Sequence, residues 1–104
     1  MKIVYIAHPY EGKEENLVNA EKWVGYLISR FNIAPICAWI TYCRTNIDRE
    51  IGLTMDKQVI RRCDELWMVG GRISTGMKIE KEFAELMGIP VTDLTHLGYE
   101  APRI

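Results

Sequence analysis

The sequence alternates short apolar runs with longer segments in which apolar residues recur every three or four positions. Apolar runs of the strand type span Lys2–Ala7, Ile33–Trp39, Leu66–Val69 and Ile89–Leu94, and helical segments span Glu14–Arg30, Glu50–Arg62 and Ser74–Met87. Strands that alternate with helices predict a parallel sheet with right-handed crossovers and helices on both faces. We therefore predict a single domain, residues 1–104, with a doubly wound, Rossmann-like or flavodoxin-like α/β fold of four or five strands. The pattern also leaves open that Trp39–Tyr42 extends the second strand or adds an edge strand.

Composition narrows the class of protein. A net charge of −1 argues against a nucleic-acid polymer as partner, because such binding usually needs a basic face. No apolar run approaches the roughly 20 residues of a membrane span, and the first ten residues turn polar too early for a signal peptide. The three cysteines show neither a CxxC pair nor zinc spacing. We expect a cytoplasmic protein with reduced thiols, no metal and no cofactor.

Two carboxylates fall on the inward faces of predicted helices. At about 100° per residue, Glu80 shares a stripe with Ile79, Phe83, Ala84 and Met87. Asp56 shares one with Ile51, Met55, Val59, Ile60 and Cys63. A buried carboxylate without a partner is costly, so each is either an edge residue tied to a cap or a cation, or a functional group. Because both acids occupy the inward face of a helix, we favour a functional role for the pair.

Topology predicts that these acids meet. Ligands of open parallel sheets bind outside the carboxyl ends of the strands, near the point where strand order reverses. The loop Ala7–Lys13, the stretch Trp39–Arg49 and the turn Gly70–Gly76 leave that edge. Asp56 lies in the helix after the second segment and Glu80 in the helix after the third, so both point toward one crevice.

The turn from Gly70 to Gly76 has the features of an anion-binding loop. Gly70, Gly71 and Gly76 permit close backbone approach, Ser74 can cap the following helix, and a helix N-terminus favours negative charge. An ordinary strand-to-helix turn with a serine cap has the same features. The turn contains neither the GxxxxGK[ST] motif nor a full GxGxxG.

Aromatic residues at the same edge are candidates for stacking on a flat heterocycle. They are Tyr10, Trp39 and Tyr42, although aromatics at strand ends more often complete a core. Tyr10 follows a proline in the loop His8-Pro9-Tyr10-Glu11-Gly12. We take His8, Pro9 and Gly12 of this loop, together with Trp39, as further candidate substrate contacts.

Specific segments resemble the nucleoside 2-deoxyribosyltransferase-like superfamily, which includes deoxynucleoside 5′-monophosphate N-glycosidases. They are the strand Asp64-Glu65-Leu66-Trp67-Met68-Val69, the helix start Ser74-Thr75-Gly76-Met77-Lys78-Ile79-Glu80, and Gly88-Ile89-Pro90-Val91. The start of the chain and its CDELW segment are also similar to small uncharacterised phage and bacterial members.

The resemblance implies roles for individual residues. Glu80 matches the family nucleophile, Asp56 matches a second acid twenty-four positions earlier, and Ser74 and Gly76 match contacts to a 5′-phosphate. Glu80 is then expected to attack the anomeric carbon while Asp56 holds a sugar hydroxyl or protonates the base. Tyr10 is expected to orient Glu80 or the sugar.

The first loop departs from the Gly-Ser-x-Arg-Gly turn of the nucleotide hydrolases, which favours a nucleoside or a nucleotide held differently. Two functions account for the inward acids: cleavage or transfer at an N-glycosidic bond, and non-catalytic binding or sequestration of a nucleotide-like small molecule. A structural or adaptor role would leave these acids unexplained. Because relatives complete a shallow crevice with a second subunit, we also expect a homodimer or larger homo-oligomer.

Overall fold

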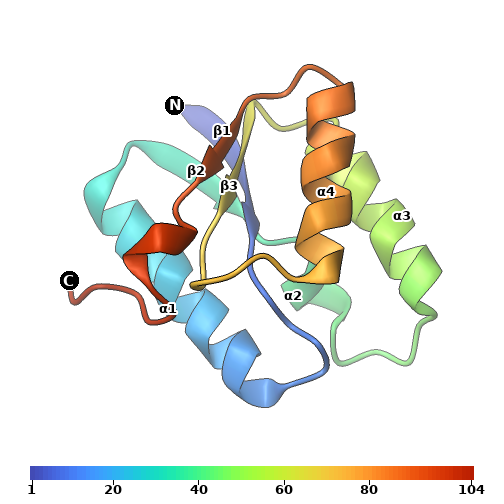
Figure 1. Cartoon of the computed structure of the whole chain (residues 1–104), viewed down its shortest axis with the longest axis horizontal. Helices are drawn as coiled ribbons and strands as arrows, with labels where there is room; N and C mark the ends of the chain where they lie inside the picture. Colours follow the sequence, from blue (N-terminus) through green and yellow to red (C-terminus); the bar gives the residue numbers. More distant parts are fainter.

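The fold is a four-stranded parallel sheet with helices on both faces. The computed structural model describes all 104 residues. Its strands are β1 (Lys2–Ala7), β2 (Ile33–Ile36), β3 (Glu65–Met68) and β4 (Val91–Asp93), in the spatial order β2-β1-β3-β4 (Figure 1). The predicted single-domain α/β fold is confirmed. In this order, which is that of flavodoxin-like sheets, the strand sequence reverses between β1 and β3.

Helices connect every pair of successive strands. They are α1 (Glu14–Arg30), the short α2 (Trp39–Tyr42), α3 (Arg49–Ile60) and α4 (Thr75–Leu86), followed by a 3₁₀ turn at Thr95–Leu97. In Figure 1, α3 and α4 lie together on one side of the sheet and α1 lies on the other. None of these helices has the length and apolar character needed to cross a bilayer.

Strand β1 supplies side chains to both cores because successive residues of a strand point to opposite faces. Tyr5 and Ala7 belong to the core beneath α3 and α4, whereas Val4 and Ile6 belong to the core beneath α1. All four are fully buried. A strand buried on both faces has a continuous apolar sequence, as the run KIVYIA indicates.

The second strand is shorter than its sequence predicts. It ends at Ile36, and Trp39–Tyr42 forms one helical turn rather than a strand extension or an edge strand. Backbone hydrogen bonds from Ile40 to Cys37 and from Cys43 to Trp39 close this turn. The strand predicted at Ile33–Trp39 is thus present but ends three residues early, and neither strand alternative for Trp39–Tyr42 is found. The turn buries the Trp39 side chain, which a solvent-facing edge position would not have done.

The inward stripe of α3 is also narrower than expected. Gly52, Asp56 and Ile60 are buried, whereas Ile51 and Met55 are 55% and 37% exposed. On α4, Glu80 and Ala84 are buried, but Met87 at the helix end is 47% exposed. Both acids are inward as predicted, while some of their expected apolar neighbours face outward.

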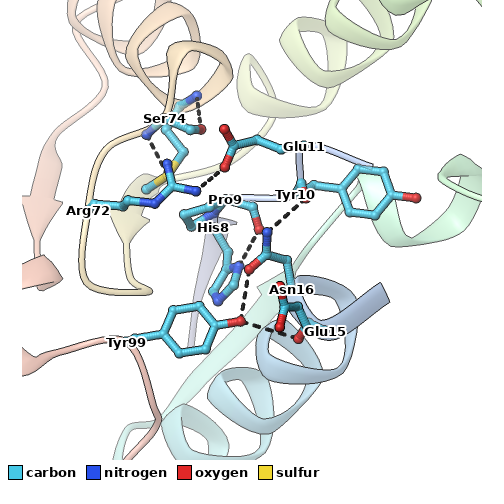
Figure 2. A network of polar contacts seen from close by, with 10 residues as sticks. His8, Pro9, Tyr10, Glu11, Glu15, Asn16, Arg72, Ser74 and Tyr99 are labelled. Atoms are coloured by element: carbon cyan, nitrogen blue, oxygen red, sulfur yellow. Dashed lines mark hydrogen bonds and ion pairs between the residues drawn. The ribbon is translucent and has the colours of Figure 1, made fainter. Parts of the chain in front are cut away.

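The segment after β4 packs against α1. The Tyr99 carbonyl accepts hydrogen bonds from Trp23 Nε1 (2.7 Å) and Asn19 Nδ2 (2.8 Å). The Tyr99 hydroxyl donates to Asn16 Oδ1 at 2.8 Å, a contact visible in Figure 2. These bonds tie the C-terminal segment to the helix that follows the first loop.

Gly70 allows the turn after β3 to pass close to the first loop. Its φ is +100°, and a Cβ there would lie 2.7 Å from His8 Cδ2 and 2.8 Å from Pro9 Cδ. We predict that Gly70→Ala lowers the free energy of unfolding by about 2 kcal/mol or more, through backbone strain and overlap together. Urea denaturation measures the change.

Gly25→Ala is the matched control. Gly25 lies within α1, and a Cβ there would meet nothing within 4 Å. It should raise stability by about 0.5–1 kcal/mol, because alanine is the better helix former. Equal effects at the two positions would contradict the proposed constraint at Gly70.

Candidate functional site

A cavity of about 360 Å³ opens at the carboxyl ends of β1 and β3. Its wall comes from the loop after β1, from α2 and the segment after it, from α3, and from the first turns of α4. The lining residues are His8, Tyr10, Glu11, Gly12, Trp39, Tyr42, Cys43, Thr45, Ile47, Asp48, Arg49, Gly52, Leu53, Asp56, Ser74, Thr75, Gly76, Met77 and Glu80. The volume lies at the small end of the range for small-molecule sites, about 300–1,000 Å³.

The two predicted carboxyls meet in the wall of this cavity. Asp56 comes from α3 and Glu80 from α4, and each side chain is only 5% exposed. The carboxyl groups lie within hydrogen-bonding reach of each other. No cation pairs with either acid, since the three ion pairs of the structure involve other carboxylates.

Two tyrosines take the place of a cationic partner. The Tyr5 hydroxyl of β1 donates to Glu80, and the Tyr42 hydroxyl of α2 donates to Asp56. The Tyr42 oxygen also lies 3.0 Å from the Gly52 carbonyl oxygen. Gly52 makes this approach possible, because a Cβ there would lie 3.1 Å from Tyr42 Cε2. Sequence reasoning missed both roles, although a hydroxyl within the apolar run of β1 was a signal for Tyr5.

Burial and mutual repulsion shift the ionisation of this cluster. Burial raises the pKa of Glu80 well above its ordinary value, and the charge of Asp56 raises it further. Burial also raises the pKa of Asp56, against the hydrogen bonds that favour its charged form. Burial and the charge of Glu80 raise the pKa of Tyr5, so this phenol keeps its proton and remains a donor. The pair of acids thus retains a proton to higher pH than two separate carboxyls would.

The N-terminus of α4 forms another part of the wall. Ser74 caps this helix, accepting from the Met77 backbone N–H at 3.3 Å, and the Arg49 guanidinium approaches the same turn. Arg49 Nη2 lies 3.9 Å from the position that a Cβ of Gly76 would occupy. Arg49, which no sequence motif indicated, therefore adds a positive charge beside the predicted Ser74 and Gly76.

Aromatic side chains line the end of the cavity near the first loop. Tyr10 stacks on Trp39 with ring centroids 5.0 Å apart, and His8 lies 6.5 Å from the same indole. The Tyr10 hydroxyl donates to the Cys43 carbonyl at 3.2 Å. Tyr5, rather than Tyr10, is therefore the tyrosine bonded to Glu80.

Burial lowers the pKa of His8, and both of its ring nitrogens already have partners, Pro9 O and Asn19 Nδ2.

Three predicted contacts lie outside the cavity wall. Pro9 is fully buried, Gly70 packs against His8 and Pro9, and Gly71 packs against the backbone of Gly98 and Tyr99. These three residues pack between neighbouring loops instead. Gly12, with φ of +71°, does line the cavity.

An ion pair joins two loops at the cavity rim. Arg72 from the turn after β3 donates to Glu11 of the first loop, close to Ser74 (Figure 2). The pair is half exposed, and Arg72 lowers the pKa of Glu11. The guanidinium of Arg72 is therefore already paired with Glu11. Arg49, which belongs to the cavity wall, forms no ion pair.

No cluster of three histidine, cysteine or acidic side chains has the geometry of a metal site. Apart from Glu11, which is ion-paired, and Asp48, which caps α3, the wall offers the carboxyls of Asp56 and Glu80, the phenols of Tyr10 and Tyr42 and the guanidinium of Arg49.

Comparison with known families assigns the chain to a family whose activity is not described. A family model described as a domain of unknown function (DUF7768) matches residues 2–94, and the chain belongs to this family. The match includes all four strands and every residue of the cavity wall. No curated protein and no solved structure matches significantly. The resemblance to the deoxyribosyltransferase-like superfamily therefore stays a prediction.

The raised carboxyl pKa values predict how stability depends on pH. A carboxyl with a higher pKa in the folded state holds its proton longer there, so unfolding releases protons and stability falls as pH rises above the ordinary carboxyl range, about pH 4. We predict that Glu80→Gln raises the free energy of unfolding at pH 7 by about 1 kcal/mol or more and flattens this decline. Urea denaturation at a series of pH values measures both effects.

Glu82→Gln provides the comparison, because Glu82 is an exposed carboxylate on the same helix. It should leave the pH profile unchanged. A wild-type profile that rises from pH 5 to pH 8 would show that burial does not destabilise the charged pair.

Proposed function

We propose that the chain cleaves or transfers at the N-glycosidic bond of a deoxyribonucleoside or a related nucleotide, with Glu80 as the nucleophile. The observation that carries the proposal is the meeting of Asp56 and Glu80 in one small cavity with phenols, not cations, as partners. A structural ion pair would have neutralised these acids. Instead they face a space of ligand size.

The contact between the acids defines their roles. In retaining glycosidases the two carboxyls stand about 5 Å apart on either side of the bond that breaks. Here they are in contact, so a sugar lies over the pair rather than between its members. In the proposed reaction the base leaves on the face opposite Glu80, and Asp56, as the hydrogen-bonded neighbour of Glu80, takes the proton that Glu80 loses and holds a sugar hydroxyl.

The reaction then has two steps. The Glu80 carboxylate forms a bond to the anomeric carbon while the bond to the base nitrogen breaks, and the electron pair leaves with the base, which takes a proton from solvent. Water or a second base then attacks the anomeric carbon, the bond to Glu80 breaks with its electron pair returning to the carboxylate, and the proton of the attacking group passes to solvent. Tyr5 holds the nucleophile by its hydrogen bond throughout the first step.

The remaining wall suits the two ends of such a substrate. Arg49, Ser74 and the N-terminus of α4 provide positive potential for the 5′ end, whether it carries a hydroxyl or a phosphate. Tyr10 and Trp39 provide flat apolar surface for the base.

The test is incubation with the four deoxyribonucleosides and their 5′-monophosphates, followed by chromatography for free base. We predict base release that falls about 10³-fold or more in Glu80→Ala. Glu82→Ala, which changes an exposed residue of the same helix, should retain activity.

Equal rates in the two variants would contradict a nucleophilic role for Glu80. Binding of a nucleoside that is recovered intact would favour the alternative function, sequestration of a nucleotide-like molecule, for which the same cavity is suited.

We further propose that the chain forms a homodimer or larger homo-oligomer. Ile51 and Met55, one turn apart on α3, are 55% and 37% exposed, and Ile47, in the segment before this helix, is 38% exposed and belongs to the cavity wall. Exposed apolar side chains beside a site opening suit a second copy of the chain. Light scattering should give at least twice the chain mass of 12.0 kDa; the mass of one chain would contradict the proposal.

A further inference from the structure

His8 is a buried titratable residue that the proposed reaction does not use. Its side chain is 4% exposed, and both ring nitrogens have partners. Nδ1 lies 2.6 Å from the Pro9 carbonyl oxygen (Figure 2), and Nε2 lies 2.8 Å from Asn19 Nδ2. A carbonyl oxygen can only accept a hydrogen bond, so Nδ1 carries a hydrogen.

The state of the second nitrogen is fixed by the C-terminal segment, residues 98–104. Asn19 Nδ2 lies 2.8 Å from the Tyr99 carbonyl oxygen as well as 2.8 Å from His8 Nε2. Because this carbonyl also can only accept, the Asn19 amide turns its NH₂ group toward it. The two hydrogens of that group then serve Tyr99 O and His8 Nε2. Nε2 is therefore an acceptor, and His8 is the neutral Nδ1–H tautomer.

This arrangement has no place for a proton on Nε2. Such a proton would face the NH₂ hydrogens of Asn19. A flip of the Asn19 amide would offer it an acceptor, but would set Oδ1 against the Tyr99 carbonyl oxygen, and two acceptors repel each other. In either case Asn19 loses its bond to His8 or to Tyr99, and a buried polar group without a partner is costly.

The charges around His8 also oppose its protonation. No carboxylate forms an ion pair with it. The groups that face it from α1, α2 and the C-terminal segment are uncharged: Asn19, Trp39 and Tyr99. The turn after β3 contributes Arg72, which is paired with Glu11 of the first loop. Burial lowers the pKa of His8 below its ordinary value, and the charge of Arg72 lowers it further.

Tyr99 connects the C-terminal segment to the first loop, which belongs to the cavity wall. Its hydroxyl donates to Asn16 Oδ1 at 2.8 Å, and Asn16 Nδ2 donates to the Tyr10 carbonyl at 2.8 Å (Figure 2). Its carbonyl accepts a further bond from Trp23 Nε1 at 2.7 Å. The segment, α1 and the first loop therefore share one hydrogen-bond network, and His8 is part of it.

We propose that His8 is a pH-sensitive latch, whose neutral ring holds residues 98–104 against α1 and whose protonation releases this segment and loosens the first loop of the cavity. The inference does not depend on the proposed function. The released form binds a proton on Nε2 more readily than the closed form does. It therefore gains population as the pH falls below the ordinary histidine pKa, about 6.5.

The test follows two NMR signals of the wild-type chain between pH 7.5 and pH 5. The ¹⁵N shifts of the His8 ring report its tautomer, and hydrogen exchange at the Trp23 indole N–H reports its contact with Tyr99. We expect the Nδ1–H tautomer at pH 7.5. Relative to the intrinsic exchange rate at each pH, exchange of the Trp23 indole should be faster at pH 5 by about fivefold or more.

His8→Gln and His96→Gln are matched variants. The glutamine of His8→Gln keeps a side-chain oxygen that can accept from Asn19 but has no ring to protonate, so the rise in exchange should disappear. His96, the other histidine of the chain, is exposed, and its replacement should leave the rise unchanged.

An Nε2–H tautomer at pH 7.5 would overturn the inference, and so would protonation of His8 without a change in Trp23 exchange. Both of these results come from the wild type, so they count whether or not His8→Gln folds. A rise in exchange that persists in His8→Gln would assign the pH response to another group and would also overturn it.

Discussion

The parallel pairing of β1 with both β2 and β3 is the constraint on which the rest of the structure depends. The central strand has no free edge, and its alternate side chains enter the cores on the two faces of the sheet. The same alternation points Tyr5 toward α4, where its hydroxyl meets Glu80. One strand therefore organises both the core and the carboxyl pair, and the loop that follows it forms part of the cavity wall.

The carboxyl pair shows how a small domain can keep two acids buried without a cation. A phenol hydroxyl donates to each carboxyl, and burial, which penalises charge, raises the pKa of both acids above their ordinary values. This arrangement costs stability at neutral pH. The three ion pairs of the structure involve other carboxylates, so the two acids beside the ligand-sized cavity have phenols as their partners.

Periodicity in the sequence was enough to place Asp56 and Glu80, since both lie on long helices where the inward face follows from a spacing of 3.6 residues. Periodicity did not predict the helical turn that contains Trp39 and Tyr42. Four residues hold barely one helical turn, so no periodic signal distinguishes a strand end from a short helix. Tyr10 shows a different difficulty: its loop leads to the cavity, but backbone geometry directs its hydroxyl to Cys43.

The order of apolar and amphipathic segments determined the α/β class, the parallel sheet and the convergence of two acids at one edge, because these follow from local spacing and from the handedness of crossovers. Tertiary structure alone decided which groups the acids contact, that Arg49 reaches the N-terminus of α4, and that one indole N–H of three is left without an acceptor. Such contacts join residues distant in sequence, and distances of a few ångströms between them depend on how the helices pack rather than on any repeat in the chain.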